Sequence, residues 1–204
     1  MKVLELFAGS RSIGKMADRM GWECYSSDIN DFEGIDYVVN ILDFDVNKVP
    51  FKPDIIWASP PCTSFSVASL GHHWTGGVGA YIPKTDSARL GIALAEKTLE
   101  IINHFDPTFW YIENPRGMLR KMPFMPNHLR KGVTYCQYGD DRMKPTDIWT
   151  NNHFWSPRPM CSNGDACHVA SPRGSQTGTQ GLKGAYERSK LPSLLCYEIL
   201  KSCI

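Results

Sequence analysis

Short apolar runs alternate with amphipathic stretches through the first half of the chain. Five such runs predict strands over residues 2–7, 22–27, 36–41, 54–58 and 109–112. Apolar residues at helical spacing predict a helix over 13–20, which Gly21 ends, and a longer helix from Thr85 or Asp86. The buried side of the longer helix is marked by Leu90, Leu94, Leu99, Ile101 and Ile102. This alternation predicts an α/β fold with a mostly parallel sheet and helices on both faces.

The second half of the chain has a weaker pattern. It predicts two later strands, over 133–138 and 147–154, and a closing helix over 191–203 that Pro192 opens. Residues 67–85 are rich in glycine and lack periodicity, which indicates a long mobile loop. We therefore expect a catalytic domain over 1–155, an irregular segment over 156–190 and a C-terminal helix over 191–204 that packs back on the domain.

Composition places the chain among ordinary globular proteins. Its 204 residues carry a net charge of +1, and no apolar stretch is long enough to span a membrane. The first strand follows Met1 almost directly, so we expect no targeting peptide and a cytoplasmic location. The seven cysteines are an odd number without framework spacing, which favours reduced thiols.

Charge is distributed unevenly along the chain. Residues 1–110 contain 9 Lys and Arg against 14 Asp and Glu, whereas residues 111–204 contain 13 against 7. The acidic half favours a small-molecule site and the basic half favours a polyanion partner. Residues 116–132 contain five Lys and Arg residues and no Asp or Glu. Two explanations stay open: these side chains contact nucleic-acid phosphates, or they form an ordinary solvent-exposed face.

The first candidate binding motif is Phe7-Ala8-Gly9-Ser10, at the first strand-to-helix turn. Open α/β sheets bind ligands outside the carboxyl ends of their strands, and Gly9 allows close backbone approach there. Asp28, at the end of the second strand, is placed to accept hydrogen bonds from ribose hydroxyls. The pair favours a cofactor that contains adenosine, although the chain has no complete dinucleotide fingerprint.

The candidate catalytic residues follow the fourth and fifth strands. Cys62 lies in Ser59-Pro60-Pro61-Cys62, where two prolines restrict the backbone, and Glu113 begins Glu113-Asn114-Pro115. Both residues end parallel strands, so we expect them at the same edge of the sheet. A thiol needs a positive neighbour to become a good nucleophile at neutral pH, and Arg142 and Lys144 are the candidates. A buried structural cysteine and a helix-initiating turn are the simpler alternatives.

These motifs resemble those of the DNA (cytosine-5)-methyltransferase family. "FAGS", "PPCTSFS" and "IENP" appear in the family's order, and "TYCQYGDDRMKPTDIW" and "RSKLPSLLCYEI" follow. The chain is most similar to the compact, phage-like members, which would place it in the cytoplasm of a bacterial host. The resemblance implies a Rossmann-like class I methyltransferase fold with S-adenosylmethionine (SAM) as cofactor and DNA as partner.

The resemblance also implies residue roles. Cys62 would be the nucleophile that adds to C6 of a flipped cytosine, and Glu113 would hold N3 and the 4-amino group. Arg142 and Lys144 would steady the base and favour the thiolate. The implied SAM contacts are Phe7, Gly9, Ser10, Asp28, Ile29, Asn40, Ile41 and Pro60. The chain is too short to hold the family's large target-recognition domain. We therefore expect that the protein reads little of the DNA sequence, that residues 116–132 or 156–185 contact the DNA, or that a dimer supplies the missing recognition surface.

Three alternatives stay open at this point. An amino-methyltransferase often has an aromatic residue where this chain has Cys62. Methylation of RNA or of a free nucleotide is the second, and a non-catalytic nucleic-acid-binding homologue is the third. Cys161, Cys167 and His168 suggest zinc, but they are only three close ligands with a spacing that fits no common finger, so we predict no metal site.

Overall fold

The computed structural model describes residues 1–77, 81–169, 182 and 184–204. Its main feature is a seven-stranded sheet with the order β3-β2-β1-β4-β7-β9-β8. The strands are β1 (Lys2–Leu6), β2 (Glu23–Asp28), β3 (Tyr37–Val38), β4 (Ile55–Ala58), β7 (Phe109–Pro115), β8 (Arg130–Thr134) and β9 (Pro145–Thr150).

Strand directions confirm the predicted fold class. Strands β3, β2, β1, β4 and β7 are parallel to one another, and β9 runs antiparallel to both of its neighbours, β7 and β8. The central strands β1 and β4 are buried along almost their whole length, as expected where helices cover both faces of a parallel sheet. The sheet is therefore the mostly parallel, Rossmann-like sheet that the sequence predicts.

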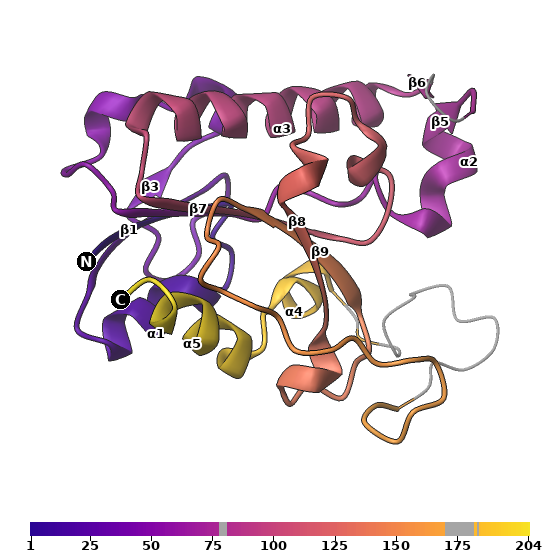
Figure 1. Cartoon of the computed structure of the whole chain (residues 1–204). Coiled ribbons are helices and arrows are strands. Elements are labelled where there is room, and N and C mark those ends of the chain that lie inside the picture. Colours follow the sequence, from indigo (N-terminus) through magenta and orange to yellow (C-terminus); the bar gives the residue numbers. More distant parts are fainter. Residues whose placement is uncertain (78–80, 170–181, 183) are drawn as a thin grey trace.

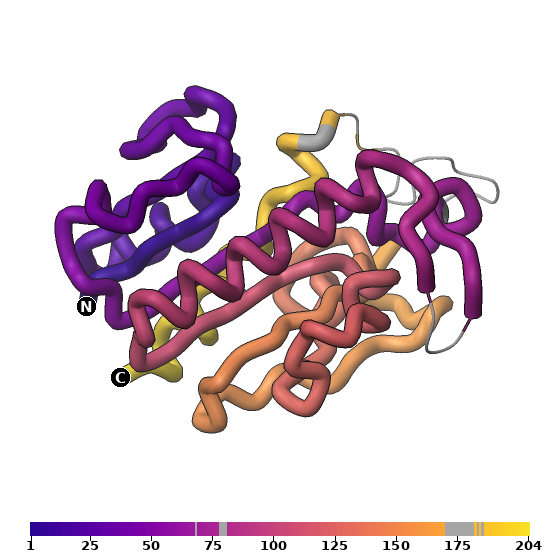
Figure 2. Tube along the Cα trace, turned by 90° about the horizontal axis from the view of Figure 1, so that it is seen from above, coloured from indigo at the N-terminus to yellow at the C-terminus, as the bar shows by residue number. Residues whose placement is uncertain are grey.

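Helices form the two outer layers. The α-helices are α1 (Ser12–Arg19), α2 (Leu70–His73), α3 (Asp86–Phe105), α4 (Ala185–Ser189) and α5 (Ser193–Lys201). Short 3₁₀ helices are η1 (Ile41–Asp43), η2 (Val46–Lys48), η3 (Val67–Ser69), η4 (Leu119–Lys121), η5 (Asn127–Leu129) and η6 (Tyr135–Tyr138). Figure 1 shows α3 along one face of the sheet and α1 with α5 along the other. Figure 2, seen from above, shows α3 running diagonally across the view, roughly along the direction of the neighbouring strands.

The helix ends follow from local chemistry. The Thr85 side chain accepts a hydrogen bond from the Ala88 N–H and so caps α3, as its sequence position predicts. The first turn of α1 has an unusual cap: the Glu5 carboxylate, on the neighbouring strand, accepts hydrogen bonds from the N–H groups of Ile13 and Gly14. Glu5 is buried, and this burial raises its pKa to about 7.

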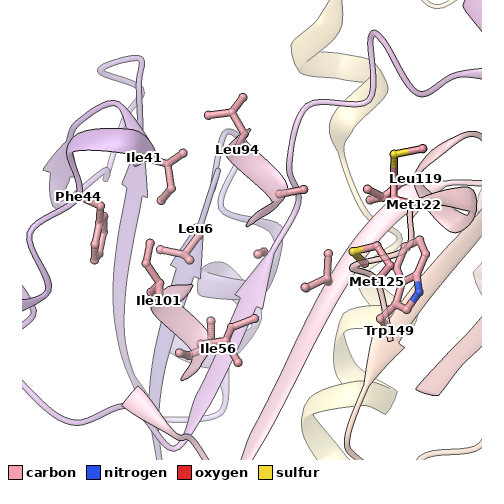
Figure 3. Close-up of a cluster of buried hydrophobic side chains, with 14 of the residues drawn as sticks. Leu6, Ile41, Phe44, Ile56, Leu94, Ile101, Leu119, Met122, Met125 and Trp149 are labelled. Atoms are coloured by element: carbon pink, nitrogen blue, oxygen red, sulfur yellow. The ribbon is translucent and has the colours of Figure 1, made fainter. Parts of the chain in front are cut away.

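Each face of the sheet has its own hydrophobic core. The core beneath α3 joins Leu6 and Ile56 from the sheet to Ile101 from the helix, and it extends to Trp149 (Figure 3). The core on the opposite face gathers apolar side chains of α1, α5 and the sheet, among them Ile13, Ile199 and Trp57. Among the described residues, no helix combines the length and apolar character needed to cross a membrane.

Several predicted boundaries are wrong. The strand expected over 133–138 is instead β8, which begins at Arg130 and ends at Thr134, followed by the 3₁₀ helix η6. Strand β9 begins and ends earlier than predicted, and β3 has only two residues. The described part of 67–85 is not a structureless loop, because it forms η3, α2 and a hairpin of β5 (Trp74–Thr75) and β6 (Ile82–Pro83). Residues 78–80, within that prediction, lie outside the described residues.

Candidate functional site

The order of the sheet places a ligand cleft at its carboxyl edge. The chain runs outward from β1 through β2 to β3, then returns to β4 on the other side of β1, and ligands of open α/β sheets bind at such a switch point. A cleft of about 210 Å³ lies there. It is lined by Phe7, Ser27, Asp28, Ile29, Val39, Asn40, Ile41, Pro61, Leu90 and Leu94.

The turn between β1 and α1 is closed by Asp28. Its Oδ2 accepts a hydrogen bond of 2.9 Å from the N–H of Gly9, and its Oδ1 accepts one of 2.9 Å from the N–H of Asn30. Gly9 has φ +48°, a left-handed conformation that favours glycine. The carboxylate therefore fixes the backbone of the turn while it lines the cleft.

Five of the residues predicted to bind a cofactor line the cleft: Phe7, Asp28, Ile29, Asn40 and Ile41. The other three do not line it, and Ser10 instead lines a separate hollow with Ser12 and Lys190. Gly9 donates to Asp28, the Ser10 hydroxyl lies 2.9 Å from that of Ser12, and the carbonyl of Pro60 accepts a hydrogen bond from Asn114.

Sequence reasoning missed Ser27, Val39, Pro61, Leu90 and Leu94 as cleft residues. Leu90 was expected on the buried side of α3, but it is 48% exposed because it faces the cleft.

The turn that carries Cys62 is held rigidly against β7. The Cys62 carbonyl accepts hydrogen bonds of 3.0 Å from the N–H groups of Phe65 and Ser66. Asn114 Nδ2 donates to the Pro60 carbonyl at 2.8 Å, and the N–H of Met118 donates to the Phe65 carbonyl at 2.6 Å. Both ends of the turn are thus tied to the neighbouring strand and the segment that follows it.

The Cys62 turn and Glu113 lie at the same edge of the sheet, because parallel strands β4 and β7 pair Ala58 with Ile112, just before the two motifs. Burial raises the pKa of the Cys62 thiol, and the Glu113 carboxylate raises it further, whereas Lys144 and Arg188 lower it. The charges of these three residues therefore act on the thiol. Sequence reasoning missed Arg188, because only the tertiary fold brings α4 to this edge.

Glu113 has a defined environment. It is buried, and its Oε1 accepts a hydrogen bond of 3.0 Å from the hydroxyl of Tyr135. Lys144 Nζ lies 4.0 Å from the same oxygen and 4.6 Å from the centre of the Tyr135 ring. Burial and the Glu113 charge raise the pKa of Tyr135 well above its ordinary value, so this hydroxyl remains a donor. Tyr135 is a further residue of the site that the sequence did not reveal.

The two predicted cations face different groups. Lys144 lies beside Glu113 and also donates to the Arg188 carbonyl at 3.1 Å. Arg142 is paired with Asp140, and its guanidinium donates to the carbonyls of Arg188 and Lys190, each at 3.3 Å. The structure therefore brings Lys144 to the thiol and carboxylate, and directs Arg142 to the segment 188–190.

The basic segment 116–132 contributes much of its charge to internal contacts. Arg120 forms a two-bonded ion pair with the buried carboxylate of Asp147, and Arg130 lies 3.9 Å from the same carboxylate. Lys131 donates to the carbonyls of Asn152 and Trp155. These pairs brace β8, β9 and η4, a role that the sequence did not suggest.

Comparison with known proteins identifies the family. No protein-family model matches the chain. Over an alignment of 224 residues the chain is 31% identical to a protein named probable DNA (cytosine-5)-methyltransferase from Frog virus 3 (isolate Goorha), and the match covers 100% of both chains.

Two solved structures are also similar. A DNMT2 mutant of Spodoptera frugiperda matches 76% of this chain and 51% of its own, with 18% identity and a TM-score of 0.45. The Dnmt2 methyltransferase of S. pombe matches 74% and 48%, with 15% identity and a TM-score of 0.44. The matched part of this chain spans about half of each of these two proteins. The full-length similarity to the viral protein is the finding that decides the assignment: the chain belongs to the DNA (cytosine-5)-methyltransferase family.

Proposed function

We propose that the protein transfers a methyl group from SAM to C5 of cytosine in DNA, through a covalent bond between Cys62 and C6 of a flipped base. The observation that carries the proposal is the parallel pairing of β4 with β7, which brings the Cys62 turn to the edge of the sheet that holds Glu113, Lys144 and the cleft. The family of the chain and the name of its viral relative, probable DNA (cytosine-5)-methyltransferase, support the same reaction.

The cleft suits SAM. Its walls are mainly apolar, with Phe7, Ile41 and Leu94 available to contact a flat purine, and Asp28 offers carboxylate oxygens to ribose hydroxyls. Asn40 lines the same cleft, and its Oδ1 already accepts a hydrogen bond from the N–H of Leu42. When bound, SAM supplies a methyl group activated by its positive sulfur.

Cys62 begins the proposed reaction. C5 of cytosine is a poor nucleophile, and addition of the thiolate to C6 breaks the C5–C6 double bond and makes C5 electron-rich. After C5 is methylated, a base removes the C5 proton. The electrons of that C–H bond restore the double bond, the C6–S bond breaks, and the Cys62 thiolate is released. The base must leave the duplex for this contact, which costs a few kcal/mol.

Glu113 complements the nucleophile. We assign it two contacts with the base: its carboxyl group protonates N3 as the thiolate adds, and it accepts a hydrogen bond from the 4-amino group. The proton returns to Glu113 when Cys62 leaves. Tyr135 fixes the carboxyl group through the bond to Oε1. Lys144 offsets the negative charge, which lies on the thiolate before addition and on the Glu113 carboxylate after N3 is protonated.

Arg142 has a positioning role in this proposal. It does not need to touch the base, because its guanidinium ties η6 and the following loop to the carbonyls of 188–190. Arg188, which lowers the pKa of the Cys62 thiol, lies in that segment. We therefore assign Arg142 the role of holding residues 188–190 in place, so that Arg188 and Lys144 stay near the active site.

The test is to locate the methyl group. Purified protein is incubated with isotopically labelled SAM and, in parallel, with duplex DNA, single-stranded DNA, RNA or free deoxycytidine nucleotides, and the digests are analysed by mass spectrometry. We expect labelled 5-methylcytosine in DNA, and its loss in Cys62→Ser with binding of SAM preserved. A label on the 4-amino nitrogen, a label in RNA or free nucleotide alone, or full activity of Cys62→Ser would overturn the proposal.

A further inference from the structure

Three thiols and one imidazole gather at a second place, outside the cleft. Cys136 lies in η6, whereas Cys161, Cys167 and His168 lie in the segment after β9. Their three Sγ atoms and one histidine ring nitrogen are all within 4.8 Å of one another. Cys136 and Cys161 are buried, and Cys167 is exposed at the edge of the group.

Four of the separations among these atoms, from 3.1 to 3.8 Å, lie near those that a tetrahedral metal ion imposes on its ligands. Zinc binds thiolate sulfur at about 2.3 Å and imidazole nitrogen at about 2.0–2.1 Å, so a tetrahedral ion holds two sulfurs about 3.8 Å apart and sulfur from nitrogen about 3.6 Å apart. The Sγ atoms of Cys136 and Cys167 are 3.6 Å apart, and those of Cys136 and Cys161 are 3.1 Å apart. Nδ1 of His168 lies 3.6 Å from Cys167 Sγ and 3.8 Å from Cys161 Sγ.

We infer that Cys136, Cys161, Cys167 and His168 bind a structural zinc ion. Thiolate with imidazole is a ligand set that selects zinc among common divalent ions, and four protein ligands leave no open position for chemistry. A disulfide between Cys136 and Cys161 is the competing use of the closest pair, but it would leave the convergence of Cys167 and His168 on the same point without a purpose.

The inferred ion fastens the segment after β9 to the wall of the proposed active site. Cys136 directly follows Tyr135, whose hydroxyl donates to Glu113. Three backbone N–H groups of the segment already donate to this wall: that of Cys161 to Thr134 Oγ1, that of Arg158 to the Tyr138 hydroxyl, and that of Val169 to the Asp141 carbonyl. A short segment with few apolar anchors gains most of its order from such a cross-link.

The fourth ligand of the inferred site has no signal in the sequence. Cys136 is 25 positions before Cys161, and a strand lies between them, so the fourth ligand has no local spacing signal. Strand β9 carries the chain away from η6, because its end pairs with the start of β8, Trp149 with Arg130. The segment after β9 then runs back along β8 from Lys131 to Thr134, which brings the three later ligands to Cys136.

The test measures metal in the full chain, expressed with zinc in the medium and purified without chelators. We expect about one zinc per chain by elemental mass spectrometry, as four protein ligands for one ion require. Replacement by cobalt should give the visible bands of a tetrahedral ion and a thiolate-to-cobalt charge-transfer band. Cys136→Ser and Cys167→Ser should each lose most of the bound metal, whereas Cys24→Ser, a half-buried cysteine in β2, should retain it.

Loss of zinc from Cys167→Ser cannot be attributed to misfolding, because the exposed Cys167 thiol contributes little to packing. Circular dichroism can verify that the variant is folded. Three results would each overturn the inference: reduced thiols with no bound zinc, a disulfide between Cys136 and Cys161 in intact-mass and peptide analysis, or unchanged zinc content in folded Cys167→Ser. None of these measurements uses methylation, so the zinc site stands or falls independently of the proposed reaction.

Discussion

Gly117→Ala tests whether the rigidity of the Cys62 turn matters for reaction. A Cβ added at Gly117 would lie 2.1 Å from the Phe65 carbonyl oxygen, whereas Cβ contacts below 3.0 Å essentially never occur. The turn and the segment after β7 must therefore separate by at least 0.9 Å, the difference between these two distances. This movement breaks the hydrogen bond from the Met118 N–H to the Phe65 carbonyl.

The displacement should reach the thiol. Phe65 is fully buried and stacks on Trp74, whose indole N–H donates to the Ser64 carbonyl. Cys62 is bonded to Phe65 and Ser66 through its own carbonyl, so the turn moves as one body. A misplacement of about 1 Å in a reacting group costs about 100-fold in rate, and we expect a loss of this size in kcat/KM for DNA methylation. Overpacking should cost about 1–3 kcal/mol of folding free energy.

The assay compares initial methylation rates of Gly117→Ala and wild type at a temperature where thermal melts show both to be folded. Gly71→Ala is the matched control, because an added Cβ there meets nothing within 4 Å, and we expect its rate to equal that of wild type. A folded Gly117→Ala protein with wild-type kcat/KM would refute the argument that this contact positions Cys62.

Three further predictions concern charge. Lys144→Met removes a cation that lowers the pKa of the Cys62 thiol, so this pKa should rise further. In a pH–rate profile, methylation activity should fall at neutral pH and recover at alkaline pH. Burial raises the pKa of Glu5 from the ordinary 4.5 to about 7, so the folded state binds more protons than the unfolded state between these pH values. The free energy of unfolding should therefore fall by about 3 kcal/mol as pH rises through this window. Urea denaturation at several pH values should show this decrease for the wild type and not for Glu5→Gln. Asp147→Asn removes the buried partner of Arg120 and should cost about 3–5 kcal/mol, or roughly 10 °C in Tm by calorimetry.

Matched controls are taken from the i,i+3 ion pairs on the surface of α3. Lys97→Met at a half-buried position, and Glu100→Gln and Asp86→Asn at exposed positions, should leave the pH–rate profile, the pH dependence of stability and the Tm nearly unchanged. The charge arguments fail if Lys144→Met lowers activity equally at every pH, if stability of the wild type rises between about pH 5 and pH 7, or if Asp147→Asn melts like Asp86→Asn.

The sequence predicted the parallel part of the fold well because its strands are buried. Strands such as β1 and β4 are short, nearly continuous apolar runs, and the turns after them carry glycine or proline. Strand β8 was misplaced for the opposite reason: it is an edge strand that begins with Arg130 and Lys131, which give no apolar pattern.

The site was predictable only where its residues follow strands. Phe7 and Cys62 follow strands, Asp28 ends one, and Glu113 lies two residues before the end of β7; parallel topology brings such positions together. Tyr135, Arg188 and Leu90 reach the site or the cleft from other elements, through contacts that only tertiary packing creates.

The most direct test of the central claim is covalent trapping. Duplex DNA that contains 5-fluorocytosine is incubated with the protein and SAM, because fluorine at C5 prevents the final elimination and should leave Cys62 bonded to C6. We predict a denaturation-resistant protein–DNA adduct whose modified peptide carries the nucleotide on Cys62, and no adduct with Cys62→Ser. Absence of an adduct from wild-type protein that methylates normal DNA, or attachment at another residue, would contradict the account.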